Sequence, residues 1–200
     1  MMGACATLLL LCSCSNRQQY SINGHAYVDL GLSVKWATCN VGANSPSDYG
    51  NYYAWGEILT KSTYTEDNSK TYGNSAYNRD IGGDSSLDAA RANWGGTWRL
   101  PTEAEFQELL DNCTWKWTTQ GGHNGYKVTS KKNGNSIFLP AAGWRLDSSL
   151  NYAVESGYYW SSSPGGSDSN LACNLNFLSS GSDTDWYNRY IGRSVRPVSE

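Results

Sequence analysis

Histidine is scarce in this sequence, and the residue clusters that carry most enzyme chemistry are missing. Only two histidines occur among 200 residues, His25 and His123, and they lie far apart. No histidine and cysteine cluster has zinc-site spacing, and there is no phosphate-binding loop, dinucleotide fingerprint or nucleophile elbow. Asp183 and Asp185 lack the spacing of an EF-hand calcium loop. We therefore expect a protein that is not an enzyme, with no metal and no cofactor.

Charge is also sparse, at 16 % of residues, and the formal net charge is −3. This balance provides no basic footprint for nucleic acid, so we expect no nucleic-acid partner. Aromatic residues are plentiful by contrast, with 9 Trp and 14 Tyr. Such side chains bury large surfaces and also serve as contacts for ligands. The composition indicates a folded extracellular domain with many loops.

A long hydrophobic run is absent as well. The apolar stretch Ala4 to Leu11 is far shorter than the roughly 20 residues that span a bilayer. It is typical of the apolar core of a secretory signal, although no Lys or Arg precedes it. The following Leu-Cys-Ser-Cys resembles a bacterial lipobox, which makes Cys14 the lipidated first residue of the mature protein. An ordinary cleaved signal is the alternative.

These features predict residues 1–13 as a lipoprotein signal peptide and residues 14–22 as the lipidated cysteine with a polar tether. A lipid anchor implies a place in the bacterial outer membrane, facing either the cell surface or the periplasm. Export makes disulfides feasible for the cysteines that follow Cys14. Those are Cys39, Cys113 and Cys173, so at most one bridge forms among them. We expect it between Cys39 and Cys113, with Cys173 free.

Two helices are expected in the first half of the domain. Residues 85–96 predict a helix with a serine cap and a glycine stop. Residues 100–113 predict a stronger one, because Thr102 and Glu105 make a capping box and Phe106, Leu109 and Leu110 form an apolar stripe.

Short strands are expected around the helices. Two lie within residues 26–42, and a type I′ hairpin is expected at Asn133-Gly134. Further strands are predicted at residues 158–163, 172–177 and 193–198. Within residues 172–177, Leu and Phe alternate with Asn, which indicates one apolar and one polar face. With no internal repeat, the pattern favours an α+β fold with long ordered loops.

Six blocks of this sequence, in order, resemble the Fibrobacter succinogenes major paralogous domain. That family is common in bacterial lipoproteins and is related to the formylglycine-generating-enzyme type of C-type lectin-like fold. The resemblance covers residues 23–198 and implies two helices around small antiparallel sheets, with the chain ends close together. The blocks are DLGLSVKWATCNVGA, YYAWGE, WGGTWRLPTEAEFQELL, FLPAAG, YYWSSSP and GRSVRPV.

Members of this family also resemble the variable proteins of diversity-generating retroelements, in which adenines of a template are randomised. Asn codons randomised in this way yield Ser, Asp, Tyr and Gly, but not Lys, Gln or Met. From Leu146 to Gly192, about two-thirds of the residues are Ser, Asn, Asp, Tyr or Gly, and Lys, Gln and Met are absent. Glu155, Trp160 and Trp186 break the rule and are interpreted as fixed positions.

The resemblance therefore implies a variable ligand-binding region at residues 144–193, with an unknown protein or glycan as partner. Antibody binding surfaces favour the same residue types. The side chains expected to face the ligand are Leu146, Asn151, Tyr152, Ser163, Asp168, Leu171, Cys173, Asn174, Asn176, Asp183, Asp185, Tyr187, Asn188, Tyr190 and Ile191.

Three alternatives stay open. In the first, residues 144–193 form a Ser- and Asn-rich surface without diversification. In the second, the protein is a structural or adhesive envelope component with a fixed partner. The third is a relative of the formylglycine-generating enzyme, although the sequence lacks a cysteine pair arranged like that enzyme's active site. Motifs of calcium-dependent sugar binders are also missing.

Overall fold

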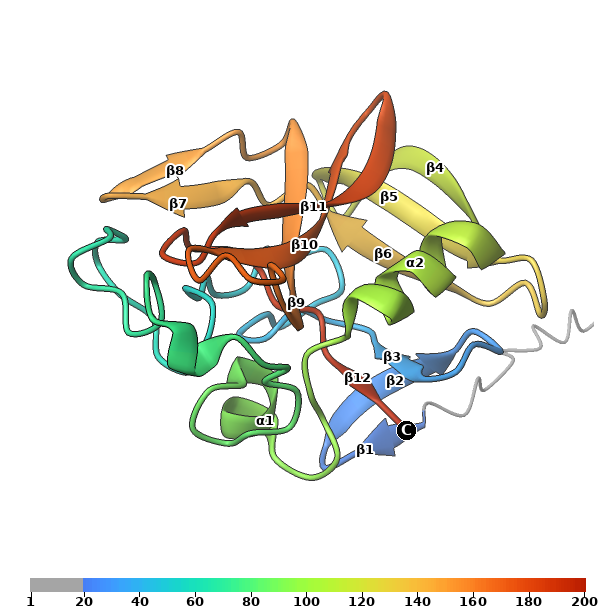
Figure 1. Ribbon diagram of the computed structural model, residues 1–200. Helices are drawn as coiled ribbons and strands as arrows, with labels where there is room; N and C mark the ends of the chain where they lie inside the picture. The colour runs from blue at the N-terminus through green and yellow to red at the C-terminus, as the bar shows by residue number, and fades with distance from the viewer. Residues whose placement is uncertain (1–19) are drawn as a thin grey trace, which may run out of the picture.

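The computed structural model describes residues 20–200, which form small antiparallel sheets and two α-helices (Figure 1). The expected α+β class is confirmed. The helices are α1 (Ala89–Trp94) and α2 (Glu103–Asn112), and a 3-10 turn spans Ser75–Tyr77. The strands are β1 (Ser21–Ile22), β2 (His25–Asp29), β3 (Lys35–Ala37), β4 (Cys113–Gln120), β5 (His123–Ser130), β6 (Ser136–Pro140), β7 (Trp144–Leu146), β8 (Ser149–Asn151), β9 (Ser156–Pro164), β10 (Leu171–Leu178), β11 (Gly181–Asn188) and β12 (Val198–Ser199).

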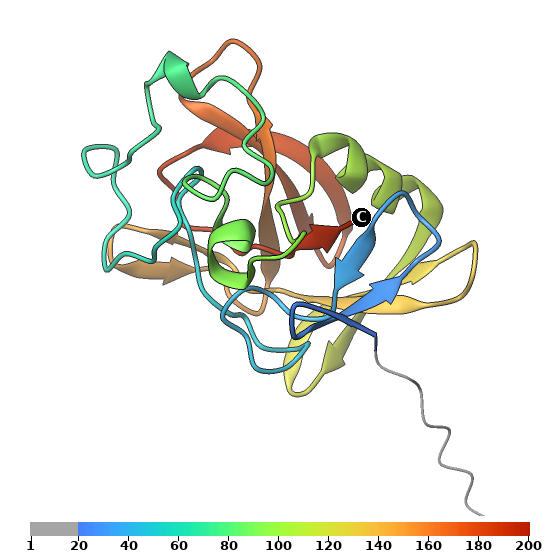
Figure 2. The ribbon, with the colours of Figure 1, turned by 90° about the horizontal axis from the view of Figure 1, so that it is seen from below.

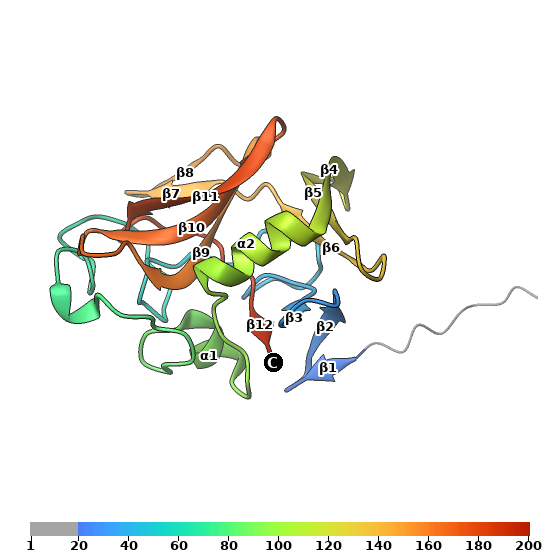
Figure 3. The same ribbon diagram turned by 45° about the vertical axis from the view of Figure 1, so that its right-hand side comes forward.

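Four sheets organise the described residues. One has the order β1-β2-β3-β12, so that the two ends of the described chain belong to the same sheet, with the C-terminal strand β12 beside β3 (Figure 2). The others are β11-β10-β9, β4-β5-β6 and the hairpin β7-β8. Helix α2 lies between the β9–β11 and β4–β6 sheets (Figure 3).

Helix α2 begins at the predicted place, whereas α1 begins at Ala89, later than the predicted start at Ser85. Thr102 Oγ1 accepts from the backbone N–H of Glu105, and the Glu105 side chain accepts in return from the Thr102 N–H, which confirms the capping box. The cap of α1 is Asp88 instead of a serine, because its carboxylate accepts from the N–H groups of Ala90 and Arg91. A carboxylate also interacts favourably with the positive end of the helix dipole.

The hairpin at Asn133-Gly134 exists between β5 and β6, but the predicted type I′ turn is wrong. The loop comprises residues 131–135, closed by a bond from the Ser130 N–H to the Asn135 carbonyl (2.8 Å). Only Gly134 of the Asn-Gly pair has positive φ, at 74°, whereas a type I′ turn needs positive φ at both central residues.

The predicted strand at residues 193–198 is mostly an extended segment that forms the centre of the molecule. Only Val198 of that segment is in β12, but its backbone bonds to many parts of the chain. Arg193 exchanges two hydrogen bonds with Tyr53, and Val198 exchanges two with Arg99. Ser194 bonds to β9, so residues 189–199 connect the loops, the sheets and the chain start.

Three arginines of this segment, Arg189, Arg193 and Arg196, are almost completely buried, and none forms a salt bridge within residues 20–200. Around Arg189 and Arg193, aromatic rings take the place of carboxylates. The Arg193 guanidinium lies 4.3 Å from the Tyr187 ring centre and 4.6 Å from that of Trp160. Cation–π contacts gain strength when desolvated.

Replacing Arg193 by alanine therefore removes one cation from several rings and leaves a cavity between them. We expect the R193A variant to lose about 3 kcal/mol of unfolding free energy, measured by urea denaturation. R91A is the matched control, because the half-buried Arg91 makes no stacked contact; we expect a smaller loss from it. Equal losses for the two variants would contradict the importance of the stack.

Candidate ligand-binding surface

The polar run Phe177 to Tyr190 is mostly a regular β-hairpin. Strands β10 and β11 pair without interruption from Leu171 opposite Asn188 to Leu178 opposite Gly181, so only Ser179 and Ser180 connect them. β11 is an edge strand of its sheet, and β10 is the central strand. The polar sequence is therefore held in the fold by a full ladder of backbone pairing.

The expectation that Cys173 and Asn174 face a ligand is wrong, because both are 0 % exposed. As a central strand, β10 has both faces covered: Leu175 and Phe177 belong to the core cluster with α2, and Ala172 belongs to the second core cluster. Asn174 instead donates from Nδ2 to the carbonyl of Asp185 (2.7 Å). Ile191, 9 % exposed, also points inward.

The other predicted side chains reach the surface. Asp168, Asp183, Asp185 and Tyr152 are exposed, and the remainder are half-buried: Leu146, Asn151, Ser163, Leu171, Asn176, Tyr187, Asn188 and Tyr190. Most lie on the hairpin β10–β11 or on the loop that joins β9 to β10. Leu146, Asn151 and Tyr152 lie apart from these, on and after the hairpin β7–β8.

Tyr187 connects this surface to the buried arginine. Its ring meets the ring of Tyr158 edge-on at 6.3 Å, and both rings cover Arg193. Burial raises the pKa of Tyr187, with the negative charge of Asp185 adding to the effect. Burial likewise lowers the pKa of Arg193. The phenol stays neutral at physiological pH and offers a rigid aromatic contact.

A first hollow, of about 290 Å³, brings together parts of the chain that are distant in sequence. Residues 65–67 form one wall, and Leu146, Asp147 and Tyr190 form the other. Tyr72 meets the Tyr190 ring edge-on at 5.0 Å. Two predicted residues, Leu146 and Tyr190, therefore line the same hollow. The acidic loop at residues 65–67 also lines it, and the sequence analysis did not assign that loop to the site.

A second hollow, of about 520 Å³, contains only one of the residues predicted to face the ligand, Leu171. It is lined by Trp186, Leu171, Glu103 and residues 164–167. Trp186, interpreted from the sequence as a position that does not vary, is 49 % exposed. A signal was available: Trp186 stands in a run of small polar residues, where no apolar neighbour predicts that it is buried.

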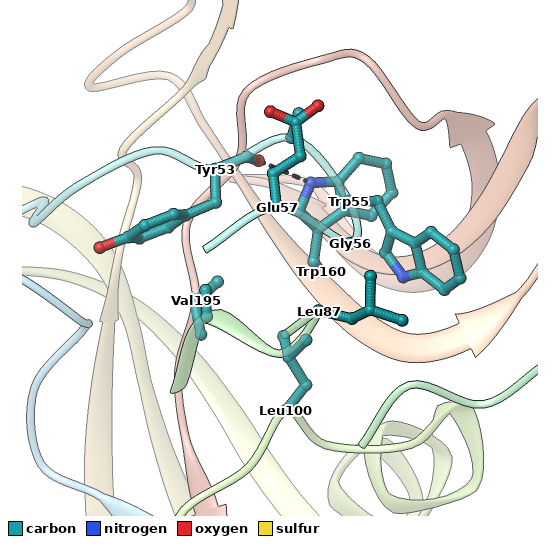
Figure 4. Close-up of a pocket in the computed structure, with 10 residues that line it drawn as sticks. Tyr53, Trp55, Gly56, Glu57, Leu87, Leu100, Trp160 and Val195 are labelled. Carbon is teal, nitrogen blue, oxygen red and sulfur yellow. Dashed lines mark hydrogen bonds between the residues drawn. The ribbon is translucent and has the colours of Figure 1, made fainter. Parts of the chain in front are cut away.

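The cavity in Figure 4 is a poor candidate for a ligand. It holds about 10 Å³ and is lined mainly by apolar side chains, among them Leu87, Leu100 and Val195. The Trp160 Nε1–H beside it already donates to the carbonyl of Tyr53 (2.9 Å). Such a volume is about the size of a single water, so the cavity is a packing defect of the core.

The expected bridge between Cys39 and Cys113 is absent, and Cys39, Cys113 and Cys173 are all free thiols. Cys113 lies in the core cluster beside α2. Cys39 lines a separate surface hollow with His25 and Trp94, whose rings stack at 3.8 Å. The two sulfurs thus occupy different environments. The predicted lipidation site, Cys14, lies outside the described residues.

Comparisons with known proteins place one match on this region. A family model described as a domain of unknown function (DUF8237) matches residues 117–198, from β4 to β12. No curated protein and no solved structure matches the chain. The match includes the hairpin β10–β11 and every residue that lines the Trp186 hollow except Glu103.

Two further findings concern the described residues. Within residues 20–200, no helix is long and apolar enough to cross a membrane. In the same part of the chain, no three His, Cys, Asp or Glu side chains gather closely enough to hold a metal ion.

The thiols provide a direct test of the burial pattern. Burial raises the pKa of Cys173 to about 12 and that of Cys113 to about 11, so neither forms the reactive thiolate at pH 8. Among the three described cysteines, we expect iodoacetamide to label only the half-buried Cys39 in the native protein. Peptide mass spectrometry locates the label, and all three should react in guanidinium. Native labelling of Cys173 would show that β10 is exposed.

Proposed function

We propose that this protein is a lipid-anchored ligand-binding protein of the bacterial envelope. In this proposal the domain at residues 23–198 is a C-type lectin-like scaffold, and the surface of residues 144–193 contacts a protein or glycan. Support for the scaffold comes from its two helices, its small antiparallel sheets and the shared sheet of the two chain ends. Fold alone does not imply a function, so the surface has to carry the argument.

The observation that carries the proposal is the distribution of exposed apolar side chains. Among the described residues, seven large apolar side chains are exposed, and five of them lie within residues 144–193. Exposed apolar surface marks interaction sites where it is contiguous, and residues 144–193 supply most of the exposed large apolar side chains of the described chain. The five are Leu150, Tyr152, Val154, Leu178 and Trp186.

Backbone strain is concentrated in the same region. Asp147, Tyr152 and Val154 have positive φ, at 50°, 53° and 70°, and only one other non-glycine residue between 20 and 200 does. This conformation is a genuine outlier for the β-branched Val154. Strained residues with exposed side chains cluster at binding sites, where the surrounding structure imposes the geometry.

The proposal extends to diversification by a retroelement. Randomised positions must tolerate almost any side chain, and the exposed residues of β11 meet this requirement. Asp183 and Asp185 point outward from a backbone held by β10. The buried positions Cys173, Asn174 and Ile191 do not meet it, so we propose that variation is confined to the surface residues.

Exchange of residues 144–193 between two related proteins with different partners tests the binding role. Because Arg189 and Arg193 secure this segment to the rest of the fold, the exchange must keep both arginines. We expect the hybrid to bind the partner of the segment donor, measured by pull-down and surface plasmon resonance. The control exchanges residues 23–88 instead and should leave partner choice unchanged.

Retention of the original partner after the first exchange would contradict the proposal. The DNA beside the gene provides the independent check on diversification. We expect a reverse-transcriptase gene and a near-copy of the 3′ coding sequence whose mismatches fall only at adenines. Mismatches at the Cys173 or Asn174 codons would contradict the restriction to surface residues.

Lipidation is tested by replacing Cys14. In the proposal, Cys14 becomes the acylated first residue, so C14S should lose incorporation of an alkyne-labelled fatty acid and leave the detergent phase of Triton X-114. C12S is the matched control and should keep both properties. Continued labelling of C14S together with loss in C12S would move the anchor to the earlier cysteine.

A further inference from the structure

The Trp186 hollow combines an aromatic surface with an unpaired carboxylate. Glu103, the first residue of α2, is half-buried and forms no ion pair within residues 20–200. Its backbone N–H donates to Ser163 Oγ (3.0 Å), which fixes the start of α2 against the end of β9. The hollow is lined by no Lys or Arg. An available carboxylate therefore lies in the same depression as a half-exposed indole.

The exposed charge of residues 144–193 is acidic. Within residues 144–193 every fully exposed charged side chain is a carboxylate, and no lysine occurs. Two of the three arginines are buried, and Arg145 lies half-buried over the Tyr52 ring at 5.2 Å. The exposed carboxylates belong to Asp147, Glu155, Asp168, Asp183 and Asp185.

The free edge of β11 does not favour an added strand. The backbone N–H of Thr184 donates to Asp183 Oδ1, and that of Trp186 donates to Asp185 Oδ1, each at 2.8 Å. These carboxylates occupy two amide donors that an added strand would need. Recognition at this edge therefore depends on side chains, with Asp183 and Asp185 on one face of β11 and Trp186 on the other.

We infer that the partner is a protein segment that presents lysine or arginine side chains, one of which enters the Trp186 hollow. This inference rests on the proposed binding function. In the hollow, the cation lies over the indole of Trp186 and pairs with the Glu103 carboxylate. The aspartates of β11 attract further basic residues of the same segment.

The test uses the full-length chain and a fluorescent ten-residue peptide of alternating Lys and Gly. Binding is followed by anisotropy, with the matching Glu-Gly peptide and maltoheptaose as the other probes. We expect only the basic peptide to bind, and more weakly as NaCl rises from 50 to 500 mM. W186A and E103Q should each weaken binding about fivefold to tenfold. D111N, an exposed carboxylate at the other end of α2, should change nothing.

Binding that is equal in W186A, E103Q and the unaltered chain would overturn the inference, as would binding of maltoheptaose in place of the peptide. Thermal unfolding of each variant confirms that its fold is retained, and the two substitutions lie on different elements. The outcome is separable from the proposed function. If residues 144–193 transfer partner choice while the basic peptide fails to bind, the binding role stands and the cationic partner is wrong.

Discussion

The buried arginines of the C-terminal segment are the constraint on which the rest of the structure depends. Removing a guanidinium from water costs several kcal/mol unless its charge and its donors find partners. Here the partners are rings and carbonyls: Arg189 lies 4.5 Å from the Trp55 ring and donates to the carbonyls of Leu171 and Thr71. Arg196 donates instead to the side-chain oxygen of Asn40 (2.8 Å) and to the carbonyl of Ala37 (3.2 Å). Each arginine thereby fixes a stretch of loop that has little regular structure of its own.

Because the buried residues hold the backbone in place, exposed side chains of the C-terminal region can be substituted. The side chains of Asp183 and Asp185 can change without disturbing the core, because β11 is held by backbone pairing with β10. Tyr187 is different, since its ring covers Arg193 at 4.3 Å. Loss of that ring would open the buried cation to water. The surface therefore contains positions with unequal freedom, although their composition is alike.

Local patterns in the sequence were enough to place α2, its capping box and the strands around Gly31 and Asn133. They failed for β11, because Gly, Ser, Asp and Asn are depleted in strands and only Thr184 is β-branched. They also failed for Cys173 and Asn174, since alternation implies a polar face only when one side of the sheet meets water. The proposed disulfide rested on the number of cysteines, which contains no information about their separation. Trp186 was left out of the predicted ligand-facing residues because randomised Asn codons do not yield tryptophan. That argument says whether a residue varies but not whether it contacts a ligand.

That last distinction bears on how a diversified surface would work. If Trp186 and Glu103 are constant while Asp183 and Asp185 vary, every variant retains the same contact for a cationic side chain. The constant pair then supplies affinity that is common to all variants, and the neighbouring positions supply the differences between partners. Specificity is a difference of affinities, so a shared contact need not reduce it. An indole and a carboxylate that line one hollow are suited to this division, because an aromatic side chain loses little conformational entropy on binding.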